Sequence, residues 1–97
     1  MGSIVPQSRN FAVDPEFRPP LPARVKILHP VITTAPPMHA EILGVEKGRL
    51  QVRVPRSIVV GSTVQVRSGH RIAFGAVRSS VSTGTDYQID VHIERLA

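Results

Sequence analysis

Arginine is the residue of this sequence with the greatest capacity for chemistry. Ten of the 12 basic side chains are arginine, there are seven acidic side chains, and the formal net charge is +5. The planar guanidinium group matches a phosphate with two parallel hydrogen bonds, so an arginine-rich basic chain suits an anionic partner such as nucleic acid, a nucleotide or a phospholipid. The same side chains also suit the water-facing side of strands, where they keep a small domain soluble.

The residues that most often carry catalysis or bind metals are scattered along the chain. No two of the four histidines have the spacing of metal ligands within one element. His39 with Glu41, and His92 with Asp90 and Glu94, share a strand face through the period of two alone. The serines fall at turns, and neither a G-x-S-x-G motif nor a phosphate-binding loop occurs. Because cysteine is also absent, the sequence predicts a chain that is not an enzyme and that holds no metal or cofactor.

Alternation of apolar and polar residues predicts β-strands through most of the chain, because successive side chains on a strand point to opposite faces. The alternation is clearest at 49–54, 63–68 and 87–93, and no window has helical periodicity. The strands are expected at about residues 23–29, 39–45, 49–54, 63–68, 72–79 and 87–93. The side chains expected to point inward are Leu50, Val52, Val54, Val64, Val66, Tyr87, Ile89, Val91 and Ile93.

Glycine, proline and small polar residues mark the connections between these strands. Residues 44–48 and 68–71 are predicted to be hairpin turns, and residues 80–86 a loop. Gly61 supplies the free φ angle that a turn requires. Gly75, inside an expected strand, predicts a bulge or a close approach of two backbones.

Six short strands in 97 residues predict one domain with an all-β fold. A small six-stranded antiparallel β-barrel is expected, because closing the sheet removes its exposed edges. Residues 1–22 contain five of the nine prolines without apolar periodicity. They predict a flexible Pro-rich N-terminal arm, without regular structure to about residue 20, ahead of a barrel at 23–97. Met1-Gly2-Ser3 is either native or a cloning scar.

The sequence also bears on where the protein acts. No apolar run approaches the roughly 20 residues of a membrane span, and the first residues lack the layout of a signal peptide. Together with the absence of cysteine, this predicts a cytoplasmic location.

The order of strands and turns resembles the PilZ family of bacterial cyclic di-GMP receptors, which are six-stranded β-barrels of about this size. Ala40–Leu43 lies where the family's second strand enters its ligand motif, and 48–55 follows as its third strand does. Residues 60–66 look like the glycine turn into strand four, 74–78 like strand five and 87–93 like the last strand. The resemblance covers residues 23–96 and implies a non-enzymatic binding or regulatory module linked to cyclic di-GMP signalling.

The family's two ligand motifs imply a site at Arg18, Arg24, Gly44, Glu46 and Arg49. The D/N-x-S-x-x-G motif falls on Gly44, Glu46 and Arg49, and the R-x-x-x-R motif corresponds to Arg18 and Arg24, which are six residues apart. In the family those two arginines hold phosphates and stack on guanines. Gly44 has no side chain to accept a hydrogen bond, and Glu46 places an anion against an anionic ligand. The resemblance therefore implies that cyclic di-GMP binds weakly or not at all, and that a protein partner is the target.

The alternative to this hypothesis is a small basic β-barrel that binds nucleic acid non-specifically. The arginine content permits it, but the aromatic content disfavours it, since a stacking platform needs several exposed rings on one sheet. The aromatic residues are Phe11, Phe17, Phe74 and Tyr87. Ionic strength separates the two hypotheses, because phosphate-driven binding weakens steeply with salt whereas an apolar protein interface barely responds.

Overall fold

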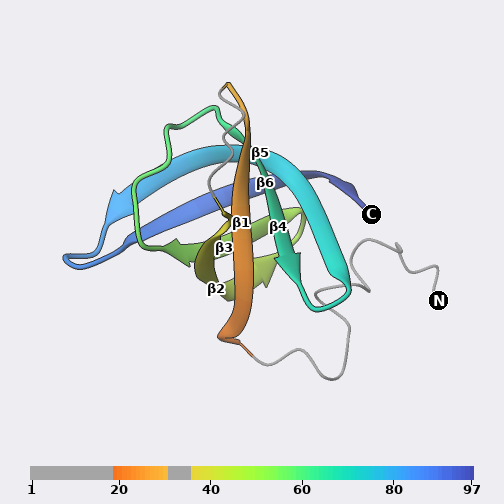
Figure 1. Cartoon of the computed structure of the whole chain (residues 1–97), viewed down its shortest axis with the longest axis horizontal. Coiled ribbons are helices and arrows are strands. Elements are labelled where there is room, and N and C mark those ends of the chain that lie inside the picture. Colours follow the sequence, from red (N-terminus) through yellow and green to blue (C-terminus); the bar gives the residue numbers. More distant parts are fainter. Residues whose placement is uncertain (1–18, 31–35) are drawn as a thin grey trace.

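The chain folds into antiparallel strands that close into a barrel, as a computed structural model shows for residues 19–30 and 36–97 (Figure 1). Neighbouring strands follow the order β1-β2-β3-β6-β5-β4, and β4 returns to pair with β1. The all-β, six-stranded antiparallel barrel expected from the alternation is therefore confirmed. The strands are β1 (Leu21–His29), β2 (Met38–Glu46), β3 (Arg49–Val54), β4 (Thr63–Ser68), β5 (Arg71–Ser82) and β6 (Tyr87–Leu96).

The strand boundaries match the alternation best where it is regular. β3 and β4 span the predicted residues, whereas β1 begins at Leu21, two residues earlier than expected. The prediction of a loop at 80–86 is wrong in its first half, because β5 continues to Ser82 and its end pairs with Gln88 and Tyr87 of β6. Backbone hydrogen bonds across the ladder hold these polar residues in a strand despite their turn-like composition. The prediction for residues 1 to about 20 falls almost entirely outside the described residues.

The interior of the barrel is filled by aliphatic side chains from all six strands. Of the nine residues expected to point inward, seven are fully buried, and Tyr87 and Ile93 are partly buried and pack against the same core. Ile58 is also buried although it lies in the β3–β4 connection rather than in a strand. The other buried apolar residues are Ala23, Val25, Ala40, Ile42, Ala73 and Val77.

Two of the register shifts in the ladders occur at glycines. Gly75 lies at a register shift between β5 and β6, as predicted, and a Cβ atom there would be 2.2 Å from the carbonyl oxygen of His92. Another shift, between Ile42 and Gly44 of β2, was not expected. The prediction of a turn over 44–48 is wrong, because β2 continues to Glu46 and pairs with β3 as far as Arg49. The turn is shorter, at Lys47 and Gly48, because Gly48 takes the positive φ of 72° that the reversal requires.

The β3–β4 connection lies against β5 through backbone hydrogen bonds. The Gly61 amide donates to the Val77 carbonyl at 2.8 Å, and the Val77 amide donates to the Ser62 carbonyl at 2.9 Å. Gly61 has a φ of 97°, so the glycine expected at this turn is used for its conformational freedom. The adjacent Val59 and Val60 remain exposed, with 74% and 56% of their surface accessible.

Candidate functional site

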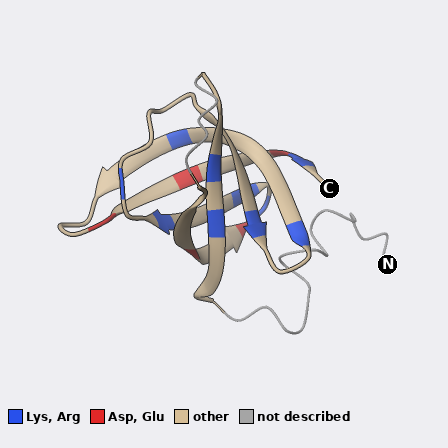
Figure 2. Ribbon diagram, in the orientation of Figure 1, with Lys and Arg blue, Asp and Glu red and all other residues tan. Residues whose placement is uncertain are grey.

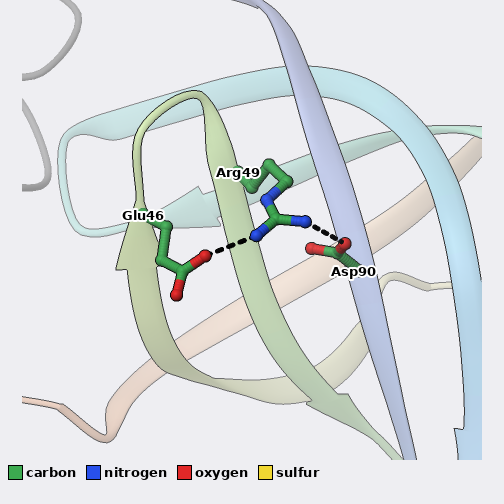
Figure 3. Close-up of polar contacts among 3 residues, drawn as sticks. All are labelled: Glu46, Arg49 and Asp90. Carbon is green, nitrogen blue, oxygen red and sulfur yellow. Dashed lines mark hydrogen bonds and ion pairs between the residues drawn. The ribbon is translucent and has the colours of Figure 1, made fainter.

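A three-residue ion cluster lies at the turn between β2 and β3, where the sequence placed two of the candidate site residues. Arg49 donates from Nη2 to Glu46 Oε1 at 2.5 Å and from Nη1 to Asp90 Oδ2 at 3.3 Å (Figure 3). The guanidinium group lies between the two carboxylates, one from β2 and one from β6 (Figure 3). Its hydrogen-bonding capacity is thus directed at the barrel's own side chains.

Strand pairing explains why these three side chains meet. The short turn places Glu46 directly opposite Arg49 in the β2–β3 ladder. In the β3–β6 ladder Arg49 pairs with His92 and Gln51 pairs with Asp90, so Asp90 is a diagonal neighbour of Arg49 on the same face. Long side chains reach across such diagonal positions. Asp90 was not among the predicted site residues, because its pairing with β3 depends on the barrel register and not on local sequence.

The electrostatics of this cluster oppose an anionic ligand. The pKa of Arg49 is raised above its ordinary value, chiefly because Glu46 accepts its hydrogen bond and also because of the nearby charge of Asp90. A raised arginine pKa keeps the group cationic to higher pH, so these contacts do not fail at neutral or mildly alkaline pH. One cation with two anions leaves the cluster net negative. A phosphate group approaching Arg49 would meet both carboxylates.

A second ion pair neutralises the other arginine of β3. Arg53 donates from Nη2 to Glu41 Oε1, across the β2–β3 ladder in which the two residues are direct partners. The pKa of Arg53 is raised, first through this hydrogen bond and then through the charge of Glu41. Both arginines of β3 are therefore engaged by carboxylates of neighbouring strands.

Gly44 is the first of four residues that are successive cross-strand partners on β2, β3, β6 and β5, on the outer face of the barrel. Gly44 pairs with Gln51, Gln51 pairs with Asp90, and Asp90 pairs with Ser79. A Cβ atom on Gly44 would be 3.2 Å from Oε1 of Gln51, so the glycine leaves room for that amide. Beside it is a shallow hollow of about 250 Å³. The hollow is lined by Gln51, Ser79, Val81, Thr83, Gln88, Ile89 and Asp90.

Arg24, one of the two arginines predicted to hold phosphates, is not part of this cluster. Arg24 lies on β1 opposite His39 of β2, five positions before Gly44. At about 3.3 Å per strand residue this separates Arg24 from Gly44 by roughly 17 Å along the strand. Arg18 lies outside the described residues. The structure thus brings Glu46 and Arg49 together, places Gly44 on the same hairpin, and leaves Arg24 on another part of the barrel.

Comparison with known proteins found no matching family model, no similar curated protein and no similar solved structure. Within residues 19–30 and 36–97, no group of three or more histidine, aspartate or glutamate side chains converges as a metal site would. The same part of the chain contains no helix with the length and apolar character to cross a membrane.

Proposed function

We propose that this chain is a non-enzymatic binding module of the PilZ-like type, cytoplasmic and linked by that resemblance to cyclic di-GMP signalling. In this proposal nucleotide binding is weak or lost, and the module acts by contact with a protein partner. The closed six-stranded barrel supports the proposal, since it is the fold that the resemblance implies. The observation that carries it is the engagement of Arg49 by Glu46 and Asp90.

The chemistry of each candidate position supports weak nucleotide binding. Gly44 offers no side-chain acceptor to a guanine edge, and Glu46 is an anion. Arg49 would have to break two ion pairs before it could meet a phosphate. Arg24 lies too far along the barrel to close the same site. Losing one charge-assisted contact costs about 1.5–3 kcal/mol, so several losses move a micromolar site to millimolar or weaker, at tenfold per roughly 1.4 kcal/mol.

Exposed apolar side chains support contact with a protein. Val59 and Val60 are adjacent in the β3–β4 connection, and Val81 lies near the end of β5 with 60% of its surface accessible. Apolar side chains in water gain free energy when a partner covers them. Such a contact would respond little to salt, unlike binding driven by phosphates.

Calorimetric titration with cyclic di-GMP tests the proposal directly. We expect no binding below the high micromolar range at neutral pH, because Arg49 is already held by two carboxylates and Arg24 lies on another part of the barrel. The proposal is overturned by a low-micromolar dissociation constant that collapses on Arg24→Ala. That result would restore a receptor role and show that Arg24 reaches the ligand.

A charge-removal variant asks whether the carboxylates are the obstacle. Glu46→Gln with Asp90→Asn releases Arg49, and we expect affinity for cyclic di-GMP to rise by up to about tenfold, equivalent to roughly 1.4 kcal/mol. Glu41→Gln with Asp86→Asn is the matched control, since it also removes two negative charges and releases Arg53 on the same strand. An equal gain in the control would mean that net charge and not the Arg49 cluster limits binding.

A further inference from the structure

The outer face of β1 and β4 brings together basic residues that are far apart in the sequence. Arg24 of β1 is the direct cross-strand partner of Arg67 of β4, and on its other side it is the partner of His39 of β2. All three side chains are exposed. In Figure 2 the basic bands of β1 and β4 lie side by side, and neither strand has an acidic band.

This arrangement destabilises the barrel, and no ion pair within the described residues offsets it. Like charges directly opposite each other on neighbouring strands are destabilising. Within residues 19–30 and 36–97, Arg24 and Arg67 have no carboxylate partner, in contrast to Arg49 and Arg53. Glu41, two positions beyond His39 on β2, is already paired with Arg53. Proteins tend to keep such an unfavourable pairing of like charges where it serves a function.

The three basic residues surround a hollow of a size suited to one phosphate group. Its volume is about 240 Å³, below the roughly 300–1,000 Å³ of pockets that enclose drug-sized ligands. The Ser68 hydroxyl donates to the Pro22 carbonyl at 2.8 Å and ties the end of β4 to the start of β1 beside it. The hollow is lined by Pro22, Ala23, Arg24, His39, Arg67 and Gly69.

The adjoining row on the same face adds a further cation and an aromatic ring. Lys26 pairs with Gln65, Gln65 pairs with Phe74, and Phe74 pairs with Arg95, across β1, β4, β5 and β6. The Arg95 guanidinium carbon lies 4.3 Å from the centroid of the Phe74 ring. Lys26 is two residues from Arg24, roughly 7 Å along the strand. Cations for the backbone and a π-surface for bases are the two components of single-stranded nucleic acid sites.

We propose that the face formed by β1, β4 and the adjoining ends of β5 and β6 binds single-stranded nucleic acid without sequence preference. Arg24 and Arg67 hold one phosphate in the hollow, with His39 beside it, and Lys26 contacts the next phosphate. The stacked pair of Phe74 and Arg95 receives a base. An acidic peptide would contact the cations but would have no group to stack on Phe74 and Arg95. The site therefore favours nucleic acid over an acidic peptide. This function lies beyond the module proposed above and uses a different surface.

Fluorescence anisotropy with a labelled thymidine oligonucleotide of about 15 nucleotides, near the upper site size of a small barrel, tests the proposal. Two neutralised phosphates predict a slope of log K against log salt of about −1.4, at roughly −0.7 per phosphate. Arg24→Glu with Arg67→Glu should weaken binding at about 50 mM salt by tenfold or more and flatten the slope to about −0.7.

The control is Arg56→Glu with Arg78→Glu, which changes the net charge equally at two exposed arginines, one in the β3–β4 connection and one on β5. It should retain most of the affinity. Equal losses in both double variants would overturn the proposal, because only net charge would then matter. The proposal is also overturned if the parent protein does not bind the oligonucleotide, or if it binds polyglutamate with the same affinity. Binding to phosphatidylserine vesicles in place of the oligonucleotide would overturn it as well.

Folding is monitored in the same experiment so that loss of binding is not loss of structure. Arg24→Gln with Arg67→Gln removes the repulsion between paired guanidinium groups, so its Tm should equal or exceed that of the parent. Oligonucleotide affinity should nevertheless fall by several-fold. A lower Tm would show that the pair stabilises the barrel and would remove the argument for a ligand. Because cyclic di-GMP is titrated separately, failure of either proposal leaves the other standing.

Discussion

Replacing Val52 with aspartate should unfold the barrel at neutral pH. Val52 is 0% exposed in the middle of β3, where it pairs with Ile42 on one side and Ile89 on the other. An unpaired charge at such a position costs several kcal/mol, against a total stability of about 5–15 kcal/mol for a domain of this kind. We expect circular dichroism to show no cooperative thermal transition.

The same substitution at Val81 serves as the control. Val81 lies on β5 with 60% of its surface exposed, so a carboxylate there stays hydrated. Val81→Asp should melt within a few degrees of the parent protein. A cooperative transition in Val52→Asp near the parent Tm would contradict the register that places Val52 inside the barrel.

Gly75→Ala should lower the free energy of unfolding by more than the usual cost of one added methyl group. The new Cβ atom would meet the His92 carbonyl oxygen at 2.2 Å, the His92 carbonyl carbon at 2.9 Å and Val91 Cγ1 at 2.9 Å. Two of these atoms belong to the backbone of β6, so the strands must separate. Overpacking of this kind costs about 1–3 kcal/mol, and urea denaturation followed by fluorescence of Tyr87 or by circular dichroism would measure it.

Gly44→Ala is the matched comparison because it places the same methyl group at a glycine beside another register shift. The nearest atom there is Gln51 Oε1 at 3.2 Å, the end of a flexible side chain that can move aside. We expect a change of less than about 1 kcal/mol, since alanine also reduces the entropy of the unfolded chain. If the two variants were equally stable, backbone contact at Gly75 would not be the reason for that glycine.

The local alternation of apolar and polar residues was sufficient to predict most of the strands and of the buried core residues. Leu50, Val52 and Val54 alternate with polar neighbours, and a period of two requires them to share one face whatever strand pairs beside them. The inward direction follows because apolar groups leave water. Gly61 marked the connection to β4 for an equally local reason, its free φ angle. At residues 80–82 the polar composition predicted a loop but the chain pairs as a strand, so the local pattern failed there.

The surface chemistry was decided by the tertiary structure. Arg49 meets Asp90 across 41 positions of sequence, and Arg24 meets Arg67 only because β4 closes the barrel onto β1. Strand order, register and bulges fix which side chains are neighbours, and all three depend on closing the whole sheet. By itself the sequence determined that the chain is a basic all-β barrel with a buried aliphatic interior. Contacts between distant strands decide which arginines are neutralised, and which face one another without a carboxylate partner in the described chain. These contacts form only when the barrel closes.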